Sequence, residues 1–417
     1  MSKNILIIGA GAIGLSTALH CARKGHRVTV VERNPARRDG CSYGNAGMVV
    51  PSHFVPLAAP GMVKLGLKWM WNPESPFYIK PRLNGELFDW GIKFWQAANA
   101  GHVRRSAPLL RDLSFASRAL FEELAAETQN DIGLVTRGLL MLCQTQHGLD
   151  DEAKFAKQAL ELGVPAEVLD RRQAAQIDPG VTMDVAGAVY FPKDAHLTPE
   201  RYLATLERLT NLLGVQFRWQ TEVTGLTVRN GKITAVQTAG GPLEADEVIL
   251  CGGSWSPLLA RELGLKIPIQ AGKGYSLTLT QPRQLPRLCS IFTEARMAVT
   301  PMGESLRFGG TMEVAGLNEE INPVRVQGII KAVPKYFPKF RVEDFAGVQP
   351  WRGLRPCSPD GMPYLGRTQR LDNLIVATGH AMMGVSLSPV TGRIVSEIVS
   401  GEKPAFDLSL LSPDRYA

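Results

Sequence analysis

The chain has 417 residues, of which 45% are hydrophobic and 20% are charged, so it is long enough for two domains or one large α/β unit. Its 46 basic and 39 acidic residues give a net charge of +7, and the basic residues are scattered without interleaved aromatic residues, which argues against nucleic-acid binding. No apolar run reaches the ~20 residues that a membrane-spanning helix requires. A strand begins almost at the N-terminus, which leaves no room for a signal peptide and predicts a cytoplasmic location.

Residues 1–32 have the order of elements that binds a dinucleotide. Residues 3–8 predict a buried strand, residues 15–23 a helix, and residues 27–31 a second strand that ends at an acid. The glycines between strand and helix allow a tight turn, close approach of a pyrophosphate and close helix packing. The helix N-terminus attracts phosphate, and the acid can accept hydrogen bonds from a ribose diol. The predicted binding residues are Gly9, Gly11, Ala12, Ile13, Gly14, Glu32 and Arg33.

The rest of the chain alternates helices and strands and has no internal repeat. The six cysteines form no Cys-x-x-Cys pair, which predicts neither a disulfide framework nor a metal site. One predicted helix has Thr198 as its N-cap and Pro199 at its first position, and Asn230-Gly231 is a hairpin turn. Helices are predicted at residues 105–128, 198–213 and 385–400, and strands at 138–143, 247–250, 275–280, 305–308 and 373–378.

These elements predict an α/β protein of two domains. A Rossmann-like domain of the glutathione-reductase type is predicted from residues 1–56, 198–256 and 346–417, and it binds the dinucleotide. An inserted α+β substrate domain on a mixed sheet is predicted from residues 57–197 and 257–345. The C-terminal strand, its glycine turn and the following helix favour flavin over nicotinamide, because a second helix N-terminus can stabilise the negative charge of a reduced isoalloxazine.

Residues 61–71 form an amphipathic segment. Such a segment either contacts a membrane surface or packs as a helix against the core, and the core-packing helix is the favoured prediction. The alternative would give the protein a peripheral contact with the cytoplasmic membrane.

The motifs, taken in order, resemble those of the D-amino-acid oxidase family of FAD enzymes, and within that family the D-amino-acid dehydrogenases most closely. The resemblance covers residues 3–401 and is more specific for the family than for the substrate. The matching motifs are Gly9-Ala10-Gly11-Ala12-Ile13-Gly14, Asn45-Ala46-Gly47, Ala58-Ala59-Pro60-Gly61, Lys273-Gly274-Tyr275-Ser276-Leu277-Thr278, Arg307-Phe308-Gly309-Gly310, Gly353-Leu354-Arg355-Pro356, Ser358-Pro359-Asp360-Gly361 and Thr378-Gly379-His380.

The resemblance implies that the cofactor is FAD, held without a covalent bond. Relatives of the sarcosine oxidase type attach flavin through a cysteine six residues before a Pro-Asp pair, where this chain has Gly353, and Cys357 is too close to Pro359. The ADP half would lie on the N-terminal glycines and the acid after the second strand. The other implied cofactor residues are Ser42, Asn45, Ala46 and Gly47 at the pyrophosphate and flavin edge, Val223 at the adenine, Gly252, Gly253 and Trp255 over the phosphates, and Gly379, His380, Gly384 and Val385 along the flavin ring.

Members of the family move a hydride from the Cα of an amino acid to flavin N5, and the resulting imine hydrolyses. Such a site needs an anchor for the substrate carboxylate, which a planar guanidinium can bind through two hydrogen bonds. Arg355 is the first candidate, with a tie to flavin or to backbone carbonyls as the alternative; Arg307 is the second, with a surface strand charge as the alternative. Tyr275 and His380 are candidates for substrate contact. The alternatives are that Tyr275 is a buried core tyrosine and that His380 is a packed histidine.

Two departures from the family pattern concern the substrate. Many oxidases carry an arginine in an Ile-x-Pro-Arg motif, whereas Met302 follows Thr300-Pro301 here. His53 lies in the loop of residues 51–61, where the dehydrogenases tend to carry an aromatic residue. An imidazole there could meet a hydroxyl group, so a D-amino acid or a cyclic imino acid, such as D-proline or a hydroxylated D-proline, is the predicted substrate.

The resemblance to dehydrogenases implies that the electron acceptor is a quinone or another membrane-linked carrier. One alternative is a glycine or sarcosine oxidase that uses O2. Another is the flavin-binding subunit of a larger dehydrogenase complex, which would make the protein part of a hetero-oligomer. A glycerol-3-phosphate dehydrogenase would need a basic cluster for phosphate, and a tRNA-linked flavoprotein would need a basic stripe that the sequence lacks.

Overall fold

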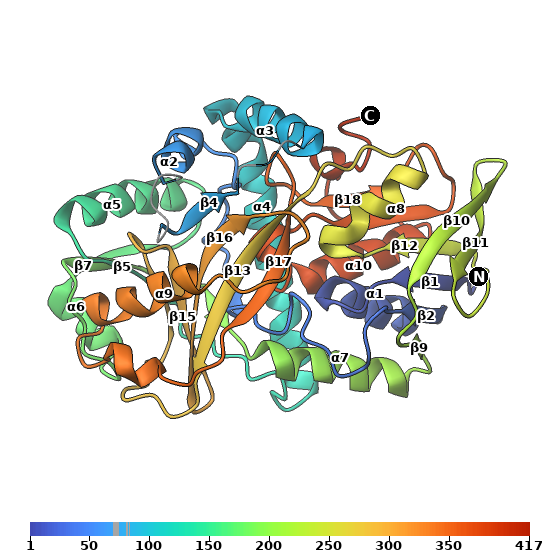
Figure 1. Ribbon diagram of the computed structural model, residues 1–417. Helices are drawn as coiled ribbons and strands as arrows, with labels where there is room; N and C mark the ends of the chain where they lie inside the picture. The colour runs from blue at the N-terminus through green and yellow to red at the C-terminus, as the bar shows by residue number, and fades with distance from the viewer. Residues whose placement is uncertain (70–74, 81, 83) are drawn as a thin grey trace.

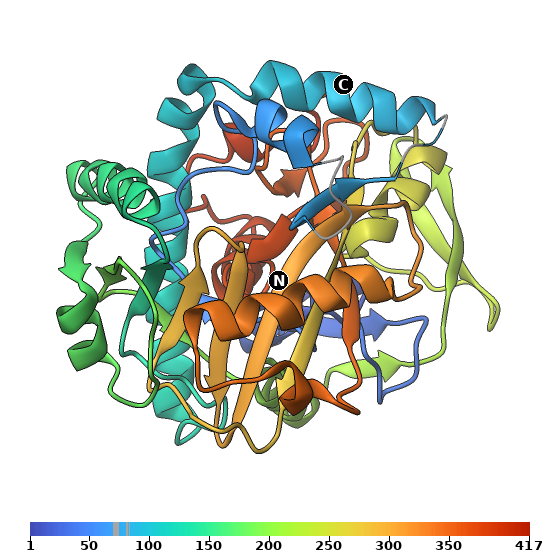
Figure 2. The same ribbon diagram turned by 60° about the vertical axis from the view of Figure 1, so that its left-hand side comes forward.

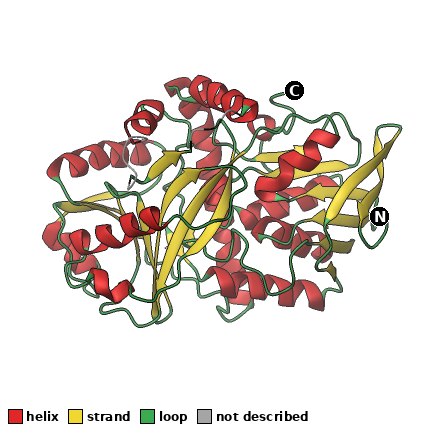
Figure 3. Cartoon of the chain, in the orientation of Figure 1, coloured by secondary structure: helices red, strands yellow, loops and turns green. Residues whose placement is uncertain are grey.

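The computed structural model describes residues 1–69, 75–80, 82 and 84–417. Two sheets lie side by side along the molecule, each covered by helices (Figures 1 and 3). The smaller sheet has the order β18-β19-β12-β1-β2-β9, with all neighbours parallel except the edge strand β18. Its strands are β1 (Asn4–Ile8), β2 (Arg27–Val31), β9 (Gln216–Arg218), β12 (Glu247–Leu250), β18 (Tyr364–Arg367) and β19 (Leu374–Thr378).

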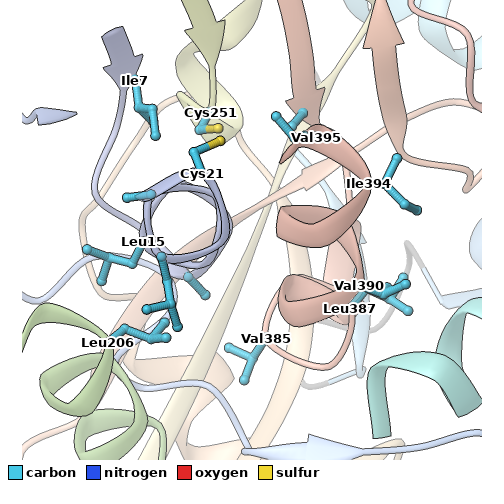
Figure 4. Packing of buried hydrophobic residues seen from close by; sticks show 14 of the residues in the cluster. Ile7, Leu15, Cys21, Leu206, Cys251, Val385, Leu387, Val390, Ile394 and Val395 are labelled. Carbon is cyan, nitrogen blue, oxygen red and sulfur yellow. The ribbon is translucent and has the colours of Figure 1, made fainter. Parts of the chain in front are cut away.

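Both faces of the smaller sheet are buried, as expected for parallel strands. Ile5 and Ile7 of β1 face one cluster of buried side chains, and Leu6 and Ile8 face another. Figure 4 shows part of the first cluster, with side chains from β1, α1, α7 and α10. Helices α1 (Ala12–Arg23), α4 (Ala100–Glu127), α7 (Pro199–Leu212) and α10 (Ser388–Val399) contribute to this cluster, while α8 (Ser256–Glu262) and the hairpin of β10 (Val223–Arg229) and β11 (Lys232–Thr238) contribute to the other.

The larger sheet is mixed and has the order β17-β13-β16-β15-β14-β5-β7-β6, with β4 added beside β16. Its parallel pairs are β14 with β5 and β16 with β4, and its other pairs are antiparallel. The strands are β4 (Phe77–Ile79), β5 (Leu139–Cys143), β6 (Glu167–Asp170), β7 (Gly187–Phe191), β13 (Gln270–Leu279), β14 (Cys289–Phe292), β15 (Met297–Met302), β16 (Ser305–Val314) and β17 (Trp351–Cys357).

The two faces of the larger sheet have different neighbours. Leu140 and Leu142 of β5 join a cluster with α9 (Pro323–Tyr336), the orange helix in front of the strands in Figure 2. Leu139 and Met141 point to the opposite face, toward the loop around Val50. The remaining elements are α2 (Met62–Trp69), α3 (Gly85–Ala97), α5 (Gln146–Glu161), α6 (Arg171–Ile177) and the short pair of β3 (Met48–Val49) with β8 (Ala195–His196).

The predicted fold class is confirmed, because a parallel nucleotide-binding sheet and a second mixed sheet are both present. Most predicted elements exist, with different ends. Helix α1 begins at Ala12 rather than Leu15, and α10 begins at Ser388 rather than at residue 385, because a single 3-10 turn, Ala381–Met383, follows His380. Thr198 is the N-cap of α7, but its side chain makes no capping hydrogen bond.

Two segments lie elsewhere than the predicted domain division placed them. Strand β17, assigned to the nucleotide-binding domain, pairs with β13 in the larger sheet. Helix α4, assigned to the substrate domain, packs Leu113 and Phe121 into the core of the smaller sheet. Each predicted domain therefore contributes one segment to the sheet or core of the other.

The favoured prediction of a core-packing helix at residues 61–71 is wrong. Helix α2 forms, but none of its residues is buried, and Leu67 is 59% exposed. Met70 and Trp71 of this segment lie outside the described residues. No helix in the described part of the chain is long and apolar enough to cross a bilayer.

A buried hydroxyl chain joins three helices of the nucleotide-binding core. The Tyr202 hydroxyl of α7 lies 2.8 Å from Ser16 Oγ of α1 and 2.9 Å from Ser388 Oγ of α10. We expect Tyr202→Phe to lower the free energy of unfolding by about 1–3 kcal/mol, because buried hydroxyls lose their partner. Urea denaturation measures the change. Tyr190→Phe is the control, since that hydroxyl bonds the Arg137 carbonyl at an exposed site, and an equal loss in both variants would contradict the assignment.

Candidate cofactor and substrate site

The glycine-rich loop brings α1 against β1. A Cβ on Gly14 would lie 1.9 Å from the Gly9 carbonyl oxygen, so only glycine lets the helix approach this closely. Gly9 has φ +106°, and a Cβ there would lie 2.7 Å from the Cys251 carbonyl oxygen. A Cβ on Gly11 would meet only Ser42 Oγ, at 3.6 Å, which leaves space beside its backbone. The three glycines thus have the separate roles that dinucleotide binding requires.

The N-terminus of α1 is open to an anion. The N-cap residue Gly11 has no side chain to cap the helix, and the first turn contains no acidic residue. The Ala12 N–H donates to Ser42 Oγ over 3.1 Å. The other N–H groups of the first turn and the positive end of the helix dipole suit a phosphate.

Glu32 lies at the end of β2, where a ribose would lie. Its carboxylate accepts hydrogen bonds from the backbone N–H of Ala10 at 2.9 Å and of Asn34 at 3.0 Å. Next to it, the Arg33 guanidinium stacks 3.9 Å above the Trp255 ring. Two segments far apart in sequence therefore meet beside the predicted adenosine position.

The loop of residues 42–47 joins the two sheets. Asn45 Oδ1 accepts the Gly47 N–H at 2.8 Å. Gly47 has φ +69°, and a Cβ there would lie 2.1 Å from the Leu197 carbonyl oxygen, so only glycine fits. Ala46 contacts the position of Gly309 on β16. This loop therefore lies between the nucleotide-binding unit and the inner face of the larger sheet.

The remaining cofactor candidates line the carboxyl ends of β12 and β19. The Thr378 hydroxyl donates to the Gly253 carbonyl at 3.1 Å, so the two strand ends are tied together. Gly379 follows with φ +78°, and Gly384 and the buried Val385 come after the short turn. Val223 is the first residue of β10. Two residues before it, the backbone N–H of Thr221 donates to the Glu32 carbonyl oxygen at 2.8 Å.

These residues fit an FAD molecule. An uncapped helix N-terminus, an acid at the end of β2 and glycine turns at the ends of β12 and β19 lie along one edge of the smaller sheet. Nδ1 of His380 is buried without a hydrogen-bond partner among the described residues, which leaves a polar atom for a bound group to satisfy.

Arg355 is half-buried on β17 and packs its guanidinium over Gly274 of β13, where a Cβ would lie 2.1 Å from Nη2. Nη1 donates to the Thr311 carbonyl oxygen at 2.7 Å, and this is its one hydrogen bond within the described residues. Burial lowers the pKa of Arg355, although a guanidinium stays charged at neutral pH. Most of its donors are therefore available to a ligand.

The carbonyl that Arg355 bonds comes from a strained residue. Thr311 has φ +62°, a conformation that is rare for a β-branched residue, next to a register shift between β13 and β16. Its hydroxyl is buried without a partner in the described part of the chain. Such strain is concentrated at functional sites.

Arg307 and Tyr275 have other partners. Arg307 donates to the Tyr43 and Asn45 carbonyls, at 3.1 and 2.9 Å, and pairs with Glu200, so it ties β16 to the cofactor loop. Tyr275 is 1% exposed on the face of β13 toward α9, and its hydroxyl donates to Glu313 at 2.7 Å. Burial and this carboxylate raise the pKa of Tyr275. These contacts favour the buried core tyrosine for Tyr275. Arg307 also has a structural role, but at 7% exposed it is not the surface strand charge that was its alternative.

The two candidate histidines differ in their surroundings. His380 is 3% exposed, its Nε2 lies 3.0 Å from Thr391 Oγ1 of α10, and burial lowers its pKa to about 3. His53 is half-buried, and its Nδ1 lies 3.0 Å from Ser52 Oγ. His380 is therefore held neutral against α10, whereas Nε2 of His53 has no hydrogen-bond partner among the described residues.

Sequence reasoning missed Arg38 and Asp194, which lie near this site. The Arg38 side chain is 3% exposed, and its guanidinium donates to the Ala10 carbonyl of the glycine-rich loop at 2.7 Å. Asp194 is fully buried and accepts hydrogen bonds from Ser52. Arg38 was one of many scattered basic residues, and no local pattern distinguishes Asp194 in a turn between two strands.

The fold and this site fit a flavoprotein oxidoreductase with a nucleotide-binding sheet and a second, mixed sheet. Residues 4–398 match the DAO family, described as FAD dependent oxidoreductase. The chain belongs to this family, the D-amino-acid oxidase family, and is an FAD-dependent enzyme, as the motifs predicted.

The relatives match over their full length. The chain is 32% identical to a D-amino acid dehydrogenase of Allorhizobium ampelinum, covering 99% of this chain and 98% of that protein. It is 34% identical to a D-amino acid dehydrogenase of Methylobacterium radiotolerans, and the match covers 99% of this chain and 100% of that protein. The fold is shared with glycine oxidase from Geobacillus kaustophilus, at a TM-score of 0.79, 24% identity and coverage of 100% and 99%. It is also shared with L-proline dehydrogenase from P. horikoshii, at a TM-score of 0.72 and 17% identity. That match covers 100% of this chain and 98% of the other.

Glu32 provides a direct test of the cofactor site. We expect Glu32→Ala to weaken FAD binding by about tenfold to a hundredfold, because the Ala10 N–H and a ribose diol both lose a charged acceptor. Flavin-fluorescence titration of the apoprotein measures the affinity. Glu244→Ala, at an exposed position, is the control, and equal affinities in the two variants would remove Glu32 from the site.

Proposed function

We propose that the enzyme dehydrogenates a small D-amino acid or cyclic imino acid, such as D-proline or a hydroxylated D-proline. The names of the full-length relatives support the substrate class, and D-amino acid dehydrogenase is the name they share. The half-buried guanidinium of Arg355, with a single protein hydrogen bond, carries the proposal. A carboxylate is the ligand that best matches such a planar, charged donor.

Arg355 would hold the substrate carboxylate, while Gly274 leaves the space that its guanidinium occupies. The chemistry that FAD supplies when bound is acceptance of a hydride from the substrate Cα, which leaves an imine for hydrolysis. Apolar residues of the inner sheet face, including Met141 and Ala298, would exclude water around the substrate. His53 would meet a ring nitrogen or hydroxyl of the substrate through its unpaired Nε2.

We infer that FAD is held without a covalent bond. Cys357 is 1% exposed, and burial raises the pKa of its thiol to about 12, so it is not the reactive thiolate that flavin attachment requires. Cys41, directly before the loop of residues 42–47, has a pKa raised by burial to about 11. Neither thiol has the low pKa of a nucleophile.

We expect Arg355→Leu to raise the KM for a reactive amino acid by about a hundredfold or more, because a charge-assisted bidentate contact is lost. Anaerobic bleaching of the flavin by a panel of D-, L- and N-methyl amino acids identifies the substrate first. Arg352→Leu on the same strand is the matched control, since that guanidinium pairs with Asp39 and with Glu319, at 3.5 Å. An unchanged KM in Arg355→Leu would remove Arg355 from the substrate site.

We propose further that electrons pass to a quinone-type carrier at a membrane surface, which α2 and α3 contact. Four apolar side chains on these helices are exposed, and we call them the α2–α3 patch. Their exposed fractions are 59% for Leu67, 74% for Phe88, 42% for Ile92 and 66% for Trp95.

Helices α2 and α3, which carry the patch, are neighbours along the upper side of the molecule in both ribbon views (Figures 1 and 2). A groove of about 400 Å³ between the helices is lined by Val63, Leu67 and Trp95. Lys64 and Lys68 are exposed on α2, so basic and apolar groups are adjacent. This combination favours an anionic lipid surface.

Vesicle binding tests this contact. We expect the protein to sediment with anionic phospholipid vesicles and Leu67→Gln to lower the partition coefficient by about tenfold, since a buried leucine contributes at least ~1.5 kcal/mol. Leu212→Gln is the control, because Leu212 is 75% exposed at the end of α7. Equal binding by both variants would contradict the membrane contact. A larger species in gel filtration that Leu67→Gln dissociates would instead favour a partner subunit at the patch.

A further inference from the structure

Three hydrogen-bonded side chains connect a buried acid to the predicted substrate site. We propose that Asp194, Ser52 and His53 form a proton relay that deprotonates the ammonium group of the substrate before its Cα is oxidised. This inference rests on the proposed function, since it requires an amine substrate. It assigns His53 as the group that touches the amine, and Ser52 and Asp194 as residues that act through it.

The buried end of the relay is fixed from two sides. Asp194 is 0% exposed in the turn between β7 and β8. Its Oδ1 accepts the Ser52 backbone N–H at 3.1 Å, and its Oδ2 accepts the Ser52 hydroxyl at 2.5 Å. Ser52 is itself 1% exposed, so water does not compete for these contacts. The carboxylate and hydroxyl are thus held in one geometry.

The other end is open. Nδ1 of His53 lies 3.0 Å from Ser52 Oγ, and Nε2 has no hydrogen-bond partner in the described part of the chain. His53 is half-buried, although Ser52 and Phe54 on either side are each 1% exposed. The imidazole is therefore less buried than its neighbours in the loop and, among the described residues, keeps one ring nitrogen free for a ligand.

The position of the loop places His53 beside the predicted flavin ring. The backbone N–H of His53 donates to the Val50 carbonyl at 3.0 Å, and the backbone N–H of Val50 donates to Ser386 Oγ at 3.3 Å. Ser386 directly follows Gly384 and Val385, which are predicted to line the ring. Val50 and Phe54 also share an apolar cluster with Met383. The loop is thus anchored to the segment where the reacting atoms would lie.

The charges around the relay suit a proton that moves inward. Burial raises the pKa of Asp194 to about 7, and Arg118 on α4 opposes this rise. Burial lowers the pKa of His53 to about 4, so a lasting imidazolium is unfavourable. The other titratable neighbour of Asp194 is the buried Cys289 thiol of β14, whose pKa is raised. A proton is therefore more stable on the Asp194 carboxylate than on the imidazole.

The transfer balances without an oxidant. An N–H bond of the substrate ammonium breaks as Nε2 of His53 gains the proton. Nδ1 of the same ring releases its proton to Ser52 Oγ, and the Ser52 hydroxyl releases its own proton to Asp194 Oδ2. The substrate becomes a neutral amine, His53 stays neutral as the other tautomer, and Asp194 becomes a carboxylic acid.

The relay requires ionised Asp194, so its rate falls as the pH falls through about 7, where that carboxylate becomes protonated. Without the relay, only substrate already neutral in solution reacts, and the rate falls below the pKa of the substrate's own ammonium group. The two cases differ in the pH at which the acid limb of kcat/KM begins.

The experiment is anaerobic flavin reduction by the best amino-acid substrate, followed against pH for the FAD-loaded enzyme and its variants. At pH 7 we expect Asp194→Asn and Ser52→Ala to reduce flavin about a hundredfold more slowly than the wild type. Above the pKa of the substrate ammonium, their rates should converge with the wild-type rate. Ser52→Thr, which keeps a hydroxyl, should restore the rate at pH 7.

Asp178→Asn is the matched control. Asp178 is 2% exposed and accepts the backbone N–H groups of Gly180 and Arg287, at 3.1 and 3.0 Å, but it lies outside the relay. We expect its pH profile to follow that of the wild type.

Several results would overturn the relay. An equal loss at every pH in Asp194→Asn and Ser52→Ala would show a structural role, and unchanged rates would show no role. If neither variant folds, the wild-type profile decides, because an acid limb at the substrate's own pKa excludes a relay. A wild-type flavin that no amino acid reduces would overturn the proposed function as well, whereas reduction with unaltered variants overturns the relay alone.

Discussion

The close approach of α1 to β1 is the contact on which the rest of the structure depends. A Cβ at Gly14 would overlap the Gly9 carbonyl, at 1.9 Å, so the helix reaches its position only because a hydrogen atom stands there. This approach directs the uncapped helix N-terminus along the edge of the smaller sheet. Glu32 and the turns after β12 and β19 meet at the same edge, as is general for ligands of open parallel sheets.

The second constraint is the joint between the two sheets. Arg307 on β16 donates to two backbone carbonyls of the loop that carries Asn45 and also pairs with Glu200 at the start of α7. The Ser276 hydroxyl on β13 donates to the Gly44 carbonyl at 3.0 Å. The loop of residues 42–47 and the larger sheet are therefore held in a fixed relative position, so a ligand on the loop would face the strand that carries Arg355. The polar groups that make this joint are buried, and each would cost free energy if left unpaired.

Individual side chains show how far sequence reasoning reached in the site. The glycine-rich hexad and Glu32 were predicted with their mechanical roles, because each role follows from local backbone geometry. Arg307, Tyr275 and His380 carried chemistry that suited a substrate, yet the Arg307 guanidinium, the Tyr275 hydroxyl and Nε2 of His380 have partners in the protein. Nδ1 of His380 is left without one among the described residues. Which face of a strand a side chain occupies depends on register, and register depends on the neighbouring strands.

The sequence by itself determined the nucleotide-binding unit, the fold class and the family, because hydrophobic periodicity, glycine turns and an acid at a strand end are local properties. Only the tertiary structure decided which arginine keeps free donors, that α2 remains on the surface, and that Asp194 lies against Ser52. Residues 52 and 194 are brought together by the pairing of β3 with β8, a contact between segments far apart in the chain. Such contacts depend on the packing of the whole molecule, and no short pattern of residues encodes them.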